Sequence, residues 1–195
     1  MASLPDMSDH IARQLRALSD LALGMAAQSA TIQRIAERYV ETLKQGGTLF
    51  FAGNGGSAAD AQHLATEYVV RYDAERRPFA AIALTTDTSL LTAAGNDLGF
   101  AEVFARQIRA VGRPGDLLVL HSTSGKSVNL VRAAEAARQR QVGTIAFLGK
   151  GGGALRGGVD DSLVVPSEIT SHIQEVHLAV QHIIVELVEQ MMQPV

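Results

Sequence analysis

The chain has 195 residues, of which 47% are hydrophobic and 19% are charged, and it contains no cysteine. This composition is typical of one globular domain with a sizeable core, and it excludes a disordered chain, disulfides and thiolate metal ligands. The formal net charge of −3 argues against a nucleic-acid partner, because phosphate backbones recruit clusters of Lys and Arg. The N-terminus, MASLPDMSDHIARQL, has no basic segment followed by an apolar one, and no stretch approaches the length of a membrane span. We therefore expect a single cytoplasmic domain, residues 1–195, that binds neither nucleic acid nor membrane.

Residues 1–46 are predicted to form an N-terminal helical segment. From Met7 to about Gln45 apolar residues recur every three or four positions, which indicates one or two amphipathic helices. Gly46 and Gly47 follow and are expected to end the helical pattern.

Residues 47–195 are predicted to form an α/β core. Short apolar runs, separated by helical stretches, follow in the order TLFFAG, FAAIALTT, DLLVLHST, GTIAFLG and DDSLVVPS. That alternation is typical of a parallel sheet covered by helices on both faces. The segment from about Ser171 to Met192 returns to helical period, with an apolar face wide enough to be buried against the core or another subunit. The stretch GKGGGALRGG is predicted to be a loop.

Three polar loops are expected at the carboxyl ends of the strands, where ligands of open parallel sheets gather. They are GNGGS at positions 53–57, AGNDLG at 94–99 and HSTSGKS at 121–127. The third follows a strongly apolar run and precedes a helical pattern from about Val128 to Arg140. Its hydroxyls and the unpaired N–H groups of a helix start are suited to a phosphate. The alternative is that a Ser or Thr only caps the helix, but four hydroxyls in six residues exceed what a cap requires.

Neither glycine-rich loop is a nucleotide signature. Gly125, Lys126 and Ser127 resemble the end of a Walker loop, but Leu120 stands where that motif needs a glycine. The GNGG turn lacks the spacing of a dinucleotide fingerprint, and such turns also occur for purely conformational reasons. A nucleotide cofactor is therefore disfavoured.

His63 and Glu67 are four residues apart in a helical stretch, so their side chains share one face. Alone, the pair indicates a surface hydrogen bond more than a metal site. The stretch QEVHLAVQH adds Gln174 and His182 to a helix that is otherwise rich in aliphatic residues, where polar groups must find partners. Two imidazoles, a carboxylate and an amide oxygen suit zinc, and Glu67 or His182 is also suited to proton transfer. His177 is equally explained as a satisfied interface residue.

Helix geometry limits this metal hypothesis. Gln174 and His182 are eight residues apart, which separates them by roughly 12 Å along a straight helix. One ion cannot take both from an ideal helix. Either Gln174 lies before a bend or at a frayed helix start, or a neighbouring subunit supplies one ligand.

At these residues the sequence resembles the phosphoheptose isomerase family, also called sedoheptulose 7-phosphate isomerases, which is built on the sugar-isomerase (SIS) domain. The resemblance runs from the N-terminal helices to the C-terminal helix. It rests on AGNGGSAADAQHLATE, ALTTDTSLLTAAGNDLGF, HSTSGKSVN and IQEVHLAVQH, which stand in the family's order and approximate spacing. The resemblance implies a flavodoxin-like parallel sheet flanked by helices and a homotetramer with active sites between subunits.

The resemblance also implies roles for individual residues. The sugar phosphate is implied to lie on Ser122, Thr123, Ser124 and Ser127. The remaining substrate contacts implied are Asn54, Gly55, Gly56, Ser57, Glu67, Arg71, Asn96, Asp97 and Gln174. The zinc ligands implied are His63, Glu67, Gln174 and His182, with one zinc ion per subunit, and the acid/base pair implied is Glu67 and His182.

The reaction implied by the resemblance converts D-sedoheptulose 7-phosphate to D-glycero-D-manno-heptose 7-phosphate, a precursor of lipopolysaccharide or capsule. Glu67 is assigned as the base at C1 and His182 as the acid at the oxygens, through a cis-enediol, although the two roles can exchange. Zinc is assigned to polarise the carbonyl.

Two positions depart from the family pattern, and two other functions compete. His121 precedes the phosphate loop where the family often has an apolar or aromatic residue, and His172 stands where many members carry an arginine. The first rival is a non-catalytic SIS protein that binds the bacterial replication initiator, and the second is a sugar-phosphate-sensing module of a regulator. The four candidate ligands together favour the enzyme over the first, and the absence of a DNA-binding module or basic charge argues against the second.

Overall fold

The computed structural model describes residues Met7–Gln193. The first six residues of the N-terminus, in which no targeting signal was expected, and the last two residues of the predicted single domain lie outside this range. Within it, none of the helices combines the length and the apolar character that a bilayer span requires.

The described residues form seven α-helices, three short 3₁₀ segments and five strands. The helices are α1 Met7–Gly24, α2 Ser29–Lys44, α3 Gly56–Val69, α4 Thr88–Asp97, α5 Val103–Val111, α6 Val128–Gln139 and α7 Thr170–Met192. The 3₁₀ segments are η1 Met25–Gln28, η2 Phe100–Glu102 and η3 Lys150–Gly157. The strands are β1 Leu49–Gly53, β2 Ala81–Ala83, β3 Leu117–Ser122, β4 Gly143–Leu148 and β5 Asp161–Val164.

The five strands form one parallel sheet in the order β2-β1-β3-β4-β5. Each of the five predicted apolar runs supplies one strand, and the order is that of flavodoxin-like folds. The register pairs Phe51 with Ala83 on one side and with Val119 on the other. The predicted α/β fold class is confirmed, and the three polar loops can be judged against a known sheet edge.

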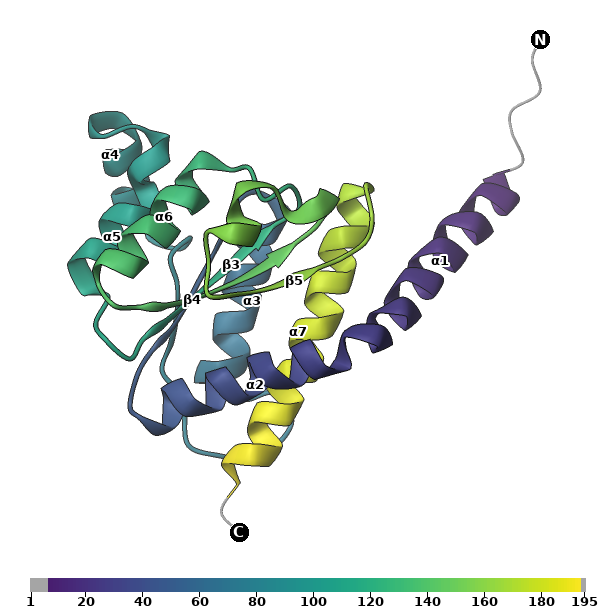
Figure 1. The fold of residues 1–195 in the computed structure, drawn as a ribbon, viewed down its shortest axis with the longest axis horizontal. Helices are drawn as coiled ribbons and strands as arrows, with labels where there is room; N and C mark the ends of the chain where they lie inside the picture. The colour runs from purple at the N-terminus through teal and green to yellow at the C-terminus, as the bar shows by residue number, and fades with distance from the viewer. Residues whose placement is uncertain (1–6, 194–195) are drawn as a thin grey trace.

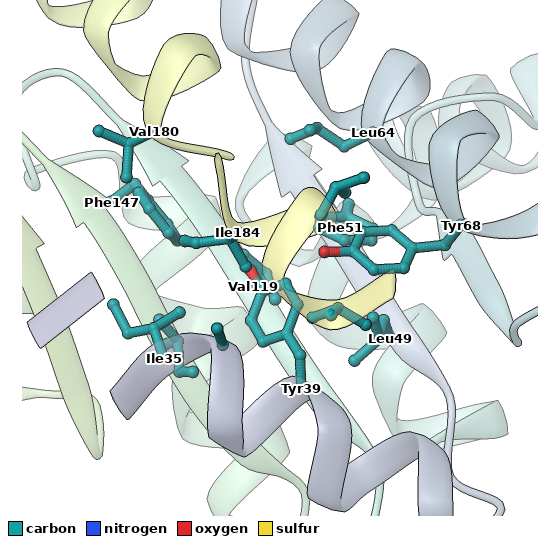
Figure 2. Close-up of a cluster of buried hydrophobic side chains, with 14 of the residues drawn as sticks. Ile35, Tyr39, Leu49, Phe51, Leu64, Tyr68, Val119, Phe147, Val180 and Ile184 are labelled. Carbon is teal, nitrogen blue, oxygen red and sulfur yellow. The ribbon is translucent and has the colours of Figure 1, made fainter. Parts of the chain in front are cut away.

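Alternate side chains of each strand enter two separate cores. On β1, Leu49 and Phe51 pack with α2, α3 and α7, whereas Phe50 and Ala52 pack with α5 and α6. This alternation follows from the period of two in a strand whose two faces are both covered. Figure 2 shows the first core, in which the rings of Phe51 and Tyr68 stack at 5.7 Å between centroids.

Helix α7 is buried against the sheet through the wide apolar face that its sequence indicated. It lies beside α3 and crosses α2 (Figure 1). Helix α1 differs, because it has no buried residue and projects away from the sheet (Figure 1). Its apolar side chains Met7, Ile11, Leu15 and Leu23 are all more than half exposed.

The prediction that residues 94–99 form a loop is wrong. Most of AGNDLG belongs to the last turns of α4, which runs to Asp97. The helix begins after Asp87, whose side chain accepts a hydrogen bond from the N–H of Leu90 at 2.9 Å and so caps it. Gly99, with φ of 87°, then turns the chain away from the helix. The sequence pattern missed α4 because its apolar stripe is short.

Buried polar side chains of β3 and α7 lie within the first core, near the carboxyl end of β3. The ring of His121 is fully buried between Phe51 and Phe147, and its Nε2 lies 2.9 Å from the amide nitrogen of Gln181. His177, also buried, donates from Nε2 to the carbonyl oxygen of Leu148 at 3.1 Å. Burial lowers the pKa of His121 to about 3 and the pKa of His177 to about 4.

We expect the free energy of unfolding to fall as the pH drops below about 6.5. The unfolded chain then binds protons at these two histidines, while the folded chain stays neutral until pH approaches 4 for His177 and 3 for His121. Each neutral histidine adds a slope of up to about 1.4 kcal/mol per pH unit. Urea unfolding between pH 7 and pH 4 measures the slope. His121→Phe should reduce it relative to the exposed-site control His10→Phe, and equal slopes would contradict the assignment.

Candidate active site

The HSTSGKS loop joins the end of β3 to the start of α6. The Ser122 hydroxyl oxygen accepts from the N–H of Gly125 at 3.0 Å, and that of Ser124 accepts from the N–H of Lys126 at 3.3 Å. Because both oxygens act as acceptors here, their O–H groups stay available to an anion. Ser127 is the N-cap residue of α6 but its side chain makes no capping hydrogen bond. At Ser127, therefore, the hydroxyl does not serve as a helix cap.

A second glycine-rich segment holds this loop in place. Gly125 has φ of 62°, and a Cβ atom there would lie 1.8 Å from the carbonyl oxygen of Gly152. A Cβ on Gly153 would in turn lie 2.6 Å from the carbonyl oxygen of Ser124, and the N–H of Leu155 donates to Gly125. The stretch 149–158 was predicted to be a loop. It contains the short 3₁₀ segment η3, but Gly151, Gly152 and Gly153 within it have positive φ and break the helical backbone, so that part is loop-like. Only glycines allow the two segments to interlock this closely.

The GNGG turn is tied to the same helix α6. The side-chain nitrogen of Asn54 donates to the side-chain oxygen of Asn129 at 3.0 Å, and the side-chain nitrogen of Asn129 donates to the side-chain oxygen of Asn54 at 2.8 Å. Gly56 begins α3, and a Cβ atom there would lie 2.7 Å from the side-chain nitrogen of Gln174. Ser57 is buried and lies 3.5 Å from that same nitrogen. The GNGG turn is thus joined to the helix that follows the HSTSGKS loop.

A shallow pocket of about 450 Å³ opens beside these loops. It is lined by Asn54, Gly55, Phe100, Ala101, Ser127, Val128 and Asn129. Phe100 and Val128 are mostly exposed apolar side chains on its rim. Asn96 and Asp97, which end α4, do not line it, and the amide of Asn96 donates to Asp97 at 2.7 Å.

The histidine and glutamate of α3 meet the histidine of α7. The Nε2 atoms of His63 and His182 lie 2.8 Å apart, and Glu67 Oε1 lies 3.4 Å from His63 Nε2. The ring of Tyr72, from the loop after α3, stacks on His182 at 5.6 Å between centroids. Burial, followed by the neighbouring His63, lowers the pKa of His182, against the opposing effect of Glu67. Three groups suited to proton transfer therefore converge on one point between two helices, and Arg71 is exposed just beyond them.

The donor types at this point suit zinc, but the predicted set of four is not assembled. Across Met7–Gln193, no three His, Asp or Glu side chains are arranged so as to hold a metal ion. Two nitrogens on one tetrahedral zinc are about 3.3 Å apart, so His63 and His182 would have to separate by about half an ångström. Gln174 lies one turn inside the helix α7 and contacts the start of α3 instead, which removes a frayed helix start as an explanation.

The two groups of polar residues lie at different heights along α3. Gly56 is at its first residue, whereas His63 lies roughly 10 Å and Glu67 roughly 16 Å further along the helix axis. The contacts of α7 follow in the same order, with Gln174 beside Ser57 and His182 beside His63. Within one chain, the GNGG turn at the start of α3 is therefore about two helical turns away from His63 and about three away from Glu67.

Sequence reasoning missed three participants in this arrangement. Asn129 lies within the quoted HSTSGKSVN stretch but was not weighed, and its burial at 4% exposure on α6 is what makes it significant. Tyr72 was also missed, as was Glu189 of α7, which accepts a hydrogen bond from the N–H of Tyr72 at 3.0 Å. The argument that singled out His182, a polar side chain on an aliphatic helix, applies equally to Glu189.

Comparison with known proteins agrees with the fold. The family model described as SIS domain matches residues 14–149. The phosphoheptose isomerase of Akkermansia muciniphila is 49% identical over 183 residues, which cover 94% of this chain and 97% of that protein. The chain belongs to the phosphoheptose isomerase family.

Two solved phosphoheptose isomerases have the same fold. The one from Francisella tularensis has a TM-score of 0.92 at 34% identity, covering 95% of this chain and all of that chain. The one from Neisseria gonorrhoeae has a TM-score of 0.84 at 40% identity, covering 94% and 97%. Because these matches span nearly the full length of both partners, the resemblance is confirmed, and the chain is an enzyme of the isomerase class.

The interlocking of the two glycine-rich loops can be tested with two alanine substitutions. Gly151→Ala places a side chain at φ of 76° with nothing within 4 Å, so it should cost only about 1–2 kcal/mol of unfolding free energy. Gly125→Ala has a similar backbone cost and also the clash with Gly152, so its loss should be clearly larger. Urea denaturation measures both. Equal losses would mean that the two loops do not constrain each other.

Proposed function

We propose that the protein converts D-sedoheptulose 7-phosphate to D-glycero-D-manno-heptose 7-phosphate, as a step in heptose precursor synthesis for lipopolysaccharide or capsule. The single observation that carries this proposal is the convergence of His63, Glu67 and His182 at the seam of α3 and α7. An aldose–ketose conversion needs a group that takes a proton from carbon and a group that handles protons on oxygen. Glu67 and His182 supply one of each.

The phosphate of the substrate is assigned to the HSTSGKS loop. Ser122, Thr123, Ser124 and Ser127 offer hydroxyls, and the start of α6 offers its N–H groups and the positive end of its dipole. The reacting carbons C1 and C2 lie at the opposite end of the sugar from the phosphate on C7. A site whose phosphate loop and acid/base groups are separated is suited to such a substrate.

The sugar itself is assigned to polar groups between these ends. Asn54, Gly55, Gly56, Ser57 and Gln174 lie at the start of α3, where Gln174 faces the glycine turn. Arg71, Asn96 and Asp97 are exposed and are assigned to the same substrate through their match to the family motif.

In the proton transfers, Glu67 removes a proton from C1, and the electron pair forms the C1–C2 double bond of a cis-enediol. His182 provides a proton to the oxygen on C2 and then takes the proton from the oxygen on C1 as the C1 carbonyl forms, so that it ends in its starting protonation state. Glu67 returns its proton to C2, which completes the aldose. His182 is placed for this part because its Nε2 lies 2.8 Å from that of His63, next to Glu67 on the same face of α3.

We further propose one zinc ion per subunit, held by His63, Glu67, His182 and Gln174. When bound, zinc polarises the carbonyl and stabilises negative charge on its oxygen. A carboxylate has two oxygens and an imidazole two nitrogens, so Glu67 and His182 each keep an atom for proton transfer. The eight-residue offset of Gln174 supports a site completed by a neighbouring subunit.

A homotetramer with active sites between subunits is also proposed, in the cytoplasm, where a cysteine-free chain needs no oxidising compartment. An apolar groove of about 590 Å³ between the first two helices and α7, together with the exposed apolar side chains of α1, offers a surface for association. Leu23 and Ile183 line this groove and are about half exposed or more.

Purified protein should interconvert the two heptose 7-phosphates, and a chelator should abolish the turnover. Metal content and molar mass by light scattering, measured on the same sample, test the zinc ion and the tetramer. Metal-replete protein that leaves sedoheptulose 7-phosphate unchanged while binding the bacterial replication initiator tightly would sink the enzymatic proposal.

Glu67→Gln should fold normally but lose at least about 100-fold in kcat, because an amide cannot take the C1 proton. The matched control is Glu175→Gln on the exposed side of α7, next to Gln174, which removes a carboxylate of the same size without touching the seam. Steady-state kinetics and thermal melts of both variants provide the comparison. Undiminished turnover in Glu67→Gln would remove Glu67 from its role as base.

A further inference from the structure

The end of α3, which carries Glu67, is held by an arginine from the following loop. The guanidinium of Arg76 donates to the carbonyl oxygens of Glu67 at 2.7 Å and Tyr68 at 3.0 Å. These carbonyls belong to the last turn of α3, where the helix itself supplies no partner. Arg76 therefore fixes the backbone that presents Glu67.

A glutamate of α7 holds both Arg76 and the loop around it. Glu189 accepts from the N–H groups of Tyr72, Asp73 and Ala74 at 3.0, 3.1 and 2.9 Å. It also accepts from Arg76 Nε at 2.7 Å. The side chains of Arg76 and Glu189 are only 10% and 5% exposed, so this is a buried pair with its hydrogen-bonding capacity used.

The loop leads back to the catalytic histidine. Glu189 lies seven residues beyond His182, which puts the two side chains on one face of α7, roughly 10 Å apart along its axis. Tyr72, whose N–H is held by Glu189, stacks its ring on His182 with 28° between the planes. The carboxylate of Glu189 on α7 thus holds the loop whose Tyr72 ring contacts His182.

We propose that Arg76 and Glu189 are positioning residues, which set Glu67 and the ring of Tyr72 against His182 for proton transfer. This inference rests on the proposed function. Unlike a lysine, Arg76 presents its N–H groups in a fixed fork, so Nε reaches the carboxylate while the two terminal nitrogens reach the two carbonyls. Misplacement of reacting groups by about 1 Å is costly. The alternative is a purely structural role, in which loss of the pair would lower the free energy of unfolding without changing kcat.

The test compares variants of this pair with a core variant elsewhere. Glu189→Gln and Arg76→Lys keep the approximate shape, but each breaks part of the network. We expect kcat to fall about tenfold or more, with KM changed by less than about threefold, because the phosphate loop lies on β3 and α6. Ile108→Ala, in the fully buried second core at α5, is the control for lost stability. A loss of kcat no larger than that of Ile108→Ala, or an effect confined to KM, overturns the proposal.

The ring of Tyr72 provides a second, independent readout. Tyr72→Ala removes the stack on His182 and should lower kcat, whereas Tyr72→Phe keeps the stack and should recover most of the loss. If Phe recovers no more than Ala, the ring does not position His182.

Crystal structures of the unaltered protein and of Glu189→Gln separate a failure of this inference from a failure of the proposed function. If the unaltered protein shows no turnover, the isomerase proposal falls, and the structures still decide the positioning role. A shift of the Glu67 main chain relative to His182 supports that role. An unchanged seam overturns it.

Discussion

The packing of α3 beside α7 is the interaction on which the site depends. The two helices run in the same direction, and polar side chains meet between them at three levels: Gln174 with Ser57, His182 with His63, and Glu189 with the loop that follows α3. The three levels are the contact with the glycine turn, the group to which we assign acid/base chemistry, and the contact with the loop beyond α3. Because both helices are buried against one sheet, none of these pairs can move without disturbing the core.

Local patterns in the sequence predicted the sheet, the N-terminal helices and α7, because hydrophobic periodicity is written in neighbouring residues. They also predicted the pairing of His63 with Glu67 and the offset between Gln174 and His182, since both follow from helix geometry alone. They could not predict Asn54 with Asn129 or Tyr72 with Glu189, which join residues 75 and 117 positions apart. They mispredicted residues 94–99, where a well-capped helix was too short to show its period.

The buried histidines show how a polar group is tolerated in the core. His121 replaces an apolar or aromatic side chain of the family pattern, yet it stacks between Phe51 and Phe147 as an aromatic residue would. The free-energy cost of burying this imidazole is limited because the ring stays neutral and because its Nε2 is paired with the side-chain amide of Gln181. The ring thus fills an aromatic position at the end of β3, and its lowered pKa makes the free energy of unfolding depend on pH.

The interlocked glycines carry a consequence for how such chains diverge. The loop after β3 and the segment after β4 occupy space that neither could occupy if the other bore a side chain at Gly125 or Gly153. A side chain introduced at Gly125 or Gly153 therefore collides with the backbone of the other loop. A viable replacement at either position requires a compensating change about thirty residues away. In steric terms the two loops behave as one unit, so insertions or larger side chains in one are expected to be tolerated only where the other also changes.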